Sequence, residues 1–107
     1  MGDLTAIAPL LKSLKGRLAA QGGARLQRVL VFGSYVRGDA QPDSDVDVAV
    51  VLSGMVDPMA DLNFLAGLSA DITFETGAVV NMLPLSVDGL EARTGFLASL
   101  RREAVAS

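Results

Sequence analysis

The sequence of 107 residues contains neither cysteine nor histidine. The absence of cysteine excludes disulfide bonds and thiolate metal sites. The absence of histidine removes the commonest general base and the commonest zinc ligand. Carboxylate side chains are therefore left as the candidate metal ligands.

Long apolar runs are also missing. No run approaches the roughly 20 apolar residues that cross a bilayer, and the N-terminus lacks the basic and apolar segments of a secretory signal. We therefore expect a cytoplasmic protein that does not associate with membranes.

Positive charge is scarce and scattered. Nine Lys and Arg residues face twelve Asp and Glu residues, which gives a net charge of −3 and a pI near 4.7. Sequence-independent binding to nucleic acid relies on clustered basic residues. Direct nucleic-acid binding is therefore not expected, and a free nucleotide or a protein is the favoured substrate.

Length and composition predict one globular domain over residues 1–107. Half of the residues are hydrophobic and a fifth are charged, which is far from the composition of disordered chains. A chain of this length builds a single core.

The most informative stretch is residues 29–52. Residues 29–32 are apolar and rich in β-branched side chains, which predicts a buried strand that ends at Gly33. Glycine allows close approach of a bulky ligand, and a serine at a helix start lies beside unpaired N–H groups. Gly33 and Ser34 are therefore candidate phosphate-binding residues.

A second strand is predicted over residues 44–52. Asp45 and Asp47 are two residues apart, so both carboxylates leave one face of an extended chain. Adjacent like charges are tolerated where a hard cation neutralises them. Only about a dozen residues separate the two strands, which favours antiparallel neighbours. That pairing places the phosphate-binding residues beside a metal site, as a nucleoside triphosphate with Mg²⁺ requires.

Gly33-Ser34, Arg37-Gly38 and Ser44-Asp45-x-Asp47 together resemble the signature of the minimal nucleotidyltransferases of the DNA polymerase beta superfamily. The resemblance implies that Asp45 and Asp47 bind Mg²⁺ and are catalytic, and that Gly33, Ser34, Arg37 and Ser44 bind the nucleotide. Several roles stay open. Ser34 is otherwise an ordinary helix cap, and Asp45 and Asp47 are otherwise charges at the start of a strand near a turn. Arg37 either contacts phosphate or Asp45, or forms a salt bridge to Asp39 or Asp43, and Ser44 is otherwise a capping group.

The rest of the chain predicts an α/β fold with a small mixed sheet of at least three strands flanked by helices, and the resemblance implies that this fold is like the polymerase beta palm. A helix is expected within residues 3–20, starting or kinking near Pro9, with an inward stripe of Leu4, Ile7, Leu11, Leu14 and Leu18. A second helix is expected over residues 58–76, with Leu62, Leu65, Leu68 and Ile72 inward.

A third strand is predicted over residues 78–83, ending before Pro84. A last helix, capped by Ser86, should continue to about residue 104. Arg93, Arg101 and Arg102 are interpreted as solvated charges or contacts to an acidic partner.

In the resembling family a third acidic residue, from a later strand, completes a two-metal site. The matching strand here has Asn81 at that place, which keeps an oxygen ligand but not the charge. Asp71 and Glu75, one helical turn apart, are interpreted as solvated charges, although either could supply the missing acid.

The resemblance implies two functions. The first is transfer of a nucleoside monophosphate, AMP from ATP, to a hydroxyl of a partner protein, as the antitoxin of a small helical HEPN-type toxin. The second is a catalytically impaired antitoxin or nucleotide-binding module that acts by complex formation, which Asn81 favours.

Overall fold

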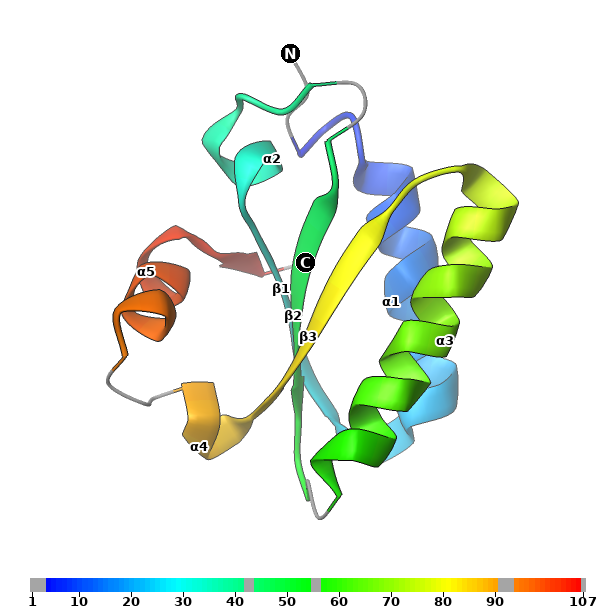
Figure 1. Ribbon diagram of the computed structural model, residues 1–107, viewed down its shortest axis with the longest axis vertical. Coiled ribbons are helices and arrows are strands. Elements are labelled where there is room, and N and C mark those ends of the chain that lie inside the picture. The colour runs from blue at the N-terminus through cyan, green and yellow to red at the C-terminus, as the bar shows by residue number, and fades with distance from the viewer. Residues whose placement is uncertain (1–3, 42–43, 55–56, 91–93, 107) are drawn as a thin grey trace.

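A computed structural model describes residues 4–41, 44–54, 57–90 and 94–106. It contains a four-stranded sheet with helices on both faces (Figure 1). The elements in chain order are α1 (Ala8–Gly22), the 3-10 helix η1 (Gly23–Arg25), β1 (Leu26–Phe32), α2 (Ser34–Arg37), β2 (Val46–Leu52), α3 (Pro58–Thr76), β3 (Val80–Ser86), α4 (Val87–Leu90), α5 (Gly95–Glu103) and β4 (Val105–Ala106). The α/β prediction with a mixed sheet is confirmed.

The strand order is β3-β2-β1-β4. β1 and β2 are antiparallel, with Phe32 opposite Asp47, as predicted from the short connection between them. β2 and β3 are parallel, with Asp47 opposite Asn81, and α3 supplies the long crossover that a parallel pair requires. The short strand β4 adds an antiparallel neighbour to β1 that the sequence did not predict.

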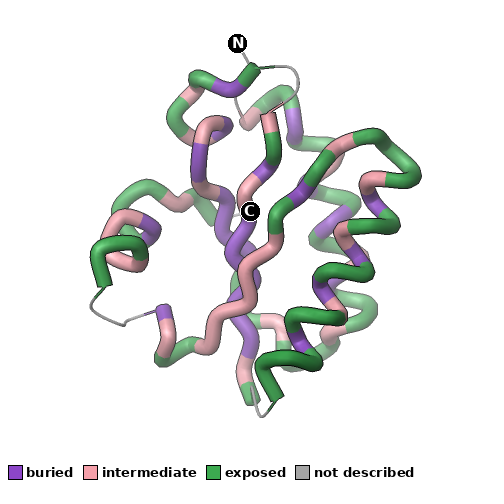
Figure 2. Tube along the Cα trace, viewed as in Figure 1, coloured by how far each residue is buried: buried purple, intermediate pink, exposed green. Residues whose placement is uncertain are grey.

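One face of the sheet is covered by α1 and α3, and the main core lies there (Figure 2). The predicted stripe of α1 is confirmed, and the regular helix begins at Ala8, next to Pro9. The core residues from α1, β2 and α3 include Leu11, Leu14, Leu18, Val46, Val48, Val50, Leu65, Leu68 and Ile72.

The inward position predicted for Leu62 is wrong, because that side chain is 44 % exposed. Asp61 takes the inward place instead and is 5 % exposed. Two hydrogen bonds of 2.9 Å from Arg25 satisfy its carboxylate. These bonds lower the pKa of Asp61 below its ordinary value, against the opposing effect of burial. An ion pair between the buried Asp61 and the partly exposed Arg25 therefore takes the inward position at the start of α3.

The third strand extends further than predicted. β3 runs through Pro84 to Ser86 because it is the edge strand, where proline removes no hydrogen bond that a further strand would need. Its start at Val80 is two residues later than expected.

The single last helix was also a wrong prediction. Ser86 Oγ accepts from Gly89 N at 2.8 Å, as expected of a cap, but α4 is short. Thr94 is extended, and its Oγ1 accepts from Leu97 N at 3.1 Å to begin α5. Arg93 lies outside the described residues. Arg101 of α5 donates to the Leu90 carbonyl at 2.7 Å.

Helix α5 lies on the second face of the sheet (Figure 1). A smaller apolar cluster forms between them, with Leu30, Ala49, Val51, Leu90 and Leu100 buried. None of the helices in the described ranges combines the length and the apolar character that a membrane crossing requires.

Candidate active site

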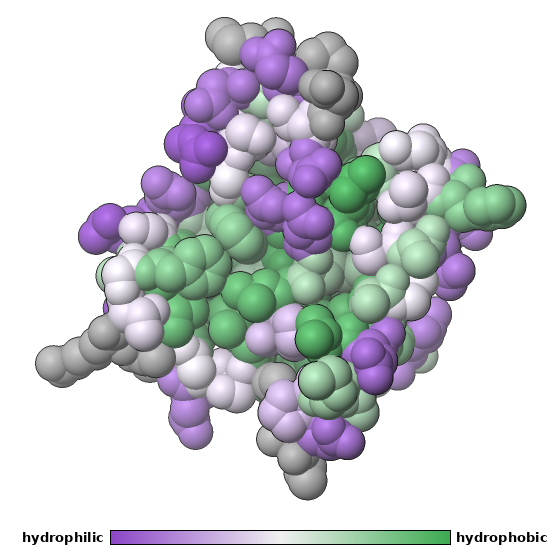
Figure 3. Space-filling view, in the orientation of Figure 1, coloured by the Kyte–Doolittle hydropathy of each residue, from purple (hydrophilic) through white to green (hydrophobic). Residues whose placement is uncertain are grey.

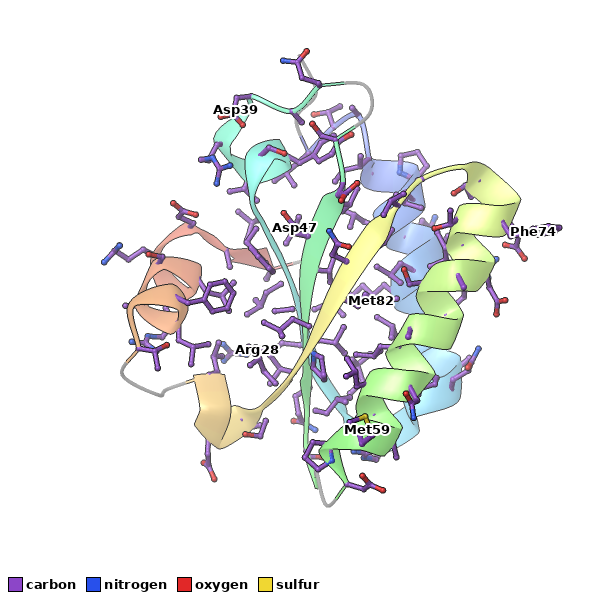
Figure 4. The ribbon with its side chains drawn as sticks, in the orientation of Figure 1. Arg28, Asp39, Asp47, Met59, Phe74 and Met82 are labelled. Carbon is purple, nitrogen blue, oxygen red and sulfur yellow. The ribbon has the colours of Figure 1, made fainter. Side chains whose placement is uncertain are left out.

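Two carboxylates and one amide meet at the start of β2. Asp47 is the second residue of β2 and Asp45 directly precedes the strand. Asn81 of β3 lies opposite Asp47 in the parallel register. Its Nδ2 donates to Asp45 Oδ2 at 3.2 Å and to Asp47 Oδ1 at 3.1 Å. A single amide group therefore bridges the two acids, and Figure 4 shows Asp47 between β1 and β3 near the upper end of the sheet.

Gly33 lies against this acidic pair. Its φ is +82°, a conformation that favours glycine. A Cβ atom at this position would lie 2.4 Å from Asp47 Oδ2, which is far inside a van der Waals contact. The antiparallel pairing of β1 with β2 produces this approach, since it sets Phe32 opposite Asp47. The sequence prediction that Gly33 lies beside the acidic pair agrees with this geometry.

Ser34 and Arg37 lie on α2, the single helical turn after Gly33. Ser34 is partly exposed at its first position. Arg37 lies 3.6 Å from Asp39 and 3.8 Å from Glu103 of α5. The alternative of a salt bridge to Asp39 is therefore realised in this structure, while Asp43 lies outside the described residues. The contact to Glu103 was not predicted.

Ser44 serves the turn that leads into Asp45. Its Oγ accepts from Gln41 N at 2.7 Å, and its carbonyl accepts from Tyr35 OH at 3.5 Å. Tyr35 is buried, so this contact ties the turn to α2. The capping interpretation of Ser44 accounts for these bonds, and its hydroxyl points into the turn.

Helix α5 forms one wall of a pocket that includes Asp47 and Gly33, and the sequence did not predict this. The pocket has a volume of about 270 Å³ and is lined by Phe32, Gly33, Arg37, Asp47, Phe96, Ser99, Leu100 and Glu103. The space-filling view shows apolar surface in the hollow between α5 and the sheet, with hydrophilic surface above it (Figure 3). The helical spacing of residues 96–103 was the signal that the sequence offered for this wall of the pocket. The sequence predicted one continuous last helix, whereas the structure has α4 and α5, so the direction in which α5 runs was not predicted.

Asp71 and Glu75 do not join the site. Both belong to α3, which packs on the opposite face of the sheet. Glu75 forms an ion pair with Arg17 of α1, and Asp71 is exposed. The suggestion that one of them supplies a third carboxylate is therefore not supported by their placement.

The groups around Asn81 fit one divalent cation. Mg²⁺ takes oxygen ligands and is commonly held by one or two carboxylates together with substrate phosphates. Asp45 and Asp47 supply two carboxylates, and rotation of the Asn81 amide would present its oxygen in place of its N–H donors. Within the described ranges no group of three acidic side chains could hold a metal ion. The donor set therefore lacks the charge that a second cation would need.

The nucleotidyltransferase domain family matches residues 11–88. The chain belongs to this family.

Two relatives of similar sequence are named as protein adenylyltransferases. "Putative protein adenylyltransferase MJ0604" of Methanocaldococcus jannaschii is 29% identical over 83 residues, 78% of this chain and 73% of that protein. Protein adenylyltransferase MntA of Thermococcus cleftensis is 46% identical over 50 residues, 47% of this chain and 48% of that protein.

Solved structures show the same fold. A "putative nucleotidyltransferase" from Sulfolobus solfataricus superimposes with a TM-score of 0.67 at 20% identity, covering 95% of this chain and 79% of that one. A toxin–antitoxin structure with AMP-PNP gives a TM-score of 0.60 at 20% identity, covering 88% and 69%. The resemblance to nucleotidyltransferases is thereby confirmed for the fold and the family.

Proposed function

We propose that this protein transfers AMP from ATP to a hydroxyl group of a partner protein and acts as the antitoxin of a toxin–antitoxin pair. The observation that carries the proposal is the acidic pair Asp45 and Asp47, bridged by Asn81 and in close contact with Gly33. Relatives named as protein adenylyltransferases support the reaction. Likeness to a toxin–antitoxin structure with AMP-PNP supports the nucleotide and the setting.

Each residue has a role in this proposal. Asp45 and Asp47 would hold Mg²⁺, and the oxygen of the Asn81 amide could serve as a further ligand. Gly33 lets the backbone before α2 lie directly against the Asp47 carboxylate, because a Cβ atom there would lie 2.4 Å from Asp47 Oδ2, and a phosphate bound at Gly33 would therefore lie beside the cation. Ser34 donates to phosphate from the start of α2, and Arg37 exchanges its exposed carboxylate partners for phosphate. Ser44 fixes the turn that aims Asp45.

The chemistry is an in-line displacement. The acceptor oxygen forms a bond to the α-phosphorus, the bond to the departing pyrophosphate breaks, and the acceptor proton passes to water. A bound divalent cation supplies neutralisation of the triphosphate charge. Asn81 is uncharged and cannot accept the proton, so of the three side chains that meet at the start of β2 only Asp45 and Asp47 carry negative charge.

The acceptor comes from a partner, which we propose to be a small helical HEPN-type toxin. We propose that residues 1–107 form one domain and that the surface of the partner provides the specificity for the acceptor.

The test is an intact-mass measurement of the captured partner after incubation with ATP and Mg²⁺. The expected result is a mass increase of one adenylyl group with the wild-type protein and none with the Asp45→Asn/Asp47→Asn variant. Asp71→Asn/Glu75→Gln is the matched control, because it also removes two carboxylate charges, from exposed sites on α3. A mass increase that persists in the double variant would contradict the assignment of the acidic pair.

A second candidate function is supported by Asn81. If the missing charge prevents transfer, the protein acts as an antitoxin or nucleotide-binding module through complex formation. A captured but unmodified partner would favour this function. Asn81→Asp separates the two, because restoring the third carboxylate should strengthen divalent-cation binding and raise the transfer rate. No change in either measurement would refute the assignment of Asn81 to the third acidic position.

A further inference from the structure

The pocket beside Asp47 contains groups that neither metal binding nor phosphate binding requires. Asp47 and Gly33 line one part of it, and Phe96, Ser99 and Glu103 line the part formed by α5. Those three residues are spaced at i, i+3 and i+7, so they share one face of the helix. The pocket therefore joins the acidic pair to an aromatic and polar surface on a different element.

Phe96 is held in place while remaining open to solvent. Its ring meets Phe32 edge-on, with centroids 6.0 Å apart and an interplanar angle of 79°. It is nevertheless 54 % exposed, whereas Leu100 on the same helix is buried and fills the small apolar cluster. A fixed aromatic ring at the rim of a pocket is a stacking surface for a planar ligand, because every nucleobase has an apolar face.

Glu103 supplies a hydrogen-bond acceptor in the same pocket. Its carboxylate lies 3.8 Å from Arg37, and both side chains are about half exposed. An exposed ion pair of this kind contributes little to stability, so either partner can be exchanged for a ligand group. A carboxylate accepts from an exocyclic amino group, which adenine carries and uracil lacks.

We propose that this pocket is the nucleobase site, in which Phe96 stacks on the base of the triphosphate and Glu103 accepts a hydrogen bond from its amino group. The inference rests on the proposed function, since the triphosphate has to lie at Gly33 and Asp47. In this arrangement phosphate draws Arg37 away from Glu103 and frees the carboxylate for the base. The pocket volume of about 270 Å³ suits a nucleoside better than a complete triphosphate, whose phosphates extend to the acidic pair.

The test compares two ligands by isothermal titration calorimetry in the presence of Mg²⁺. A non-hydrolysable ATP analogue occupies both the phosphate and the base sites, whereas inorganic tripolyphosphate occupies the phosphate site alone. Phe96→Ala should weaken binding of the ATP analogue about tenfold, as expected for loss of one stacking partner, and leave tripolyphosphate binding unchanged. Phe96→Tyr should restore binding of the analogue, because tyrosine also stacks.

Phe74→Ala is the matched control. Phe74 is 93 % exposed and projects from the outer side of α3, far from Asp47 (Figure 4). Its replacement should change neither affinity. Glu103→Ala should reduce the preference for the ATP analogue over the matching UTP analogue, a ratio from which any change in phosphate binding through the freed Arg37 cancels.

The outcomes separate this inference from the proposed function. If wild-type protein binds neither ligand, the phosphate site and the inference both fail. If it binds the ATP analogue and Phe96→Ala has no effect, the nucleobase site is wrong and the proposed function stands. If Phe96→Ala weakens both ligands equally, α5 only supports the fold of the site, and the nucleobase assignment is again overturned.

Discussion

The two faces of the sheet differ in what fills them. The face against α1 and α3 is packed with buried Leu, Val and Ile side chains. The face against α5 has a smaller cluster of buried residues and an open pocket that reaches Asp47. Stability is therefore concentrated on one face, and the groups capable of chemistry on the other.

Strand β2 carries this division within itself. Val46, Val48 and Val50 point toward α1 and α3, while Ala49 and Val51 belong to the cluster beneath α5. Asp47 continues the second set by alternation. A strand that is buried on both faces thus begins with its carboxylates at the edge of the less filled face.

The largest effect on stability is expected from the well-packed face. Leu65→Ala should lower the free energy of unfolding by about 3 kcal/mol, because the wild-type side chain is fully buried and its loss leaves a cavity. Chemical denaturation measures this. Leu62→Ala is the control on the same helix, and its exposed side chain predicts a much smaller change. Equal losses of unfolding free energy at positions 65 and 62 would contradict the assignment of Leu65 to the buried face of α3 and of Leu62 to its exposed face.

The next effect tests the contact between Gly33 and Asp47. Gly33→Ala should cost about 1–3 kcal/mol, because it strains a backbone of positive φ and also displaces the carboxylate. Gly38→Ala is the control, since its φ is +80° but a Cβ would meet nothing within 4 Å. The prediction is that only Gly33→Ala weakens Mg²⁺ binding, measured by calorimetry. Equal effects of both variants on Mg²⁺ binding would mean that the backbone, not the close approach, matters.

The segment around Gly33 could be predicted because its determinants are local. The apolar run before Gly33 and the strand pattern that begins with Asp45 and Asp47 specify two strands, and their short connection specifies an antiparallel pair. Asn81 was assigned through the resemblance, which implies an acidic residue at that place in a third apolar strand, and the parallel register brings it opposite Asp47.

The features that the sequence did not predict correctly depend on contacts between distant segments of the chain. Asp61 is inward because Arg25, on another element, satisfies its charge, so hydrophobic spacing selected Leu62 incorrectly. Pro84 fits within β3 because that strand is at the edge. The return of α5 to the pocket follows from packing of Leu100 against the sheet, which no periodicity in residues 87–104 could specify.

A smaller effect is expected from the ion pair between Arg25 and Asp61. The pKa of Asp61 is lowered in the folded protein, so the pair stabilises the fold above the ordinary pKa of aspartate, about 4, and this contribution is lost as pH falls through the lowered folded value. Asp61→Asn should reduce Tm by several degrees at pH 7. The difference from wild type should shrink on acidification toward pH 3.

Thermal unfolding at several pH values measures this dependence. The exposed Asp71, replaced by Asn, provides the control and should show no comparable pH-dependent difference. A difference at position 61 that stays constant down to pH 3 would mean that lost packing, and not the charge of the carboxylate, explains the effect.

The smallest effects on stability are expected from the ion pairs of two arginines, one arginine on each face of the sheet. Arg37 contacts Asp39 and Glu103 beside the pocket, and Arg17 pairs with Glu75 between α1 and α3. Replacing either arginine by alanine should change the free energy of unfolding by less than about 1 kcal/mol, because solvent screens these three pairs. Only Arg37→Ala should weaken binding of tripolyphosphate with Mg²⁺, measured by calorimetry. If Arg17→Ala weakens it equally, the effect is one of net charge, and the proposed role of Arg37 at the phosphate site is wrong.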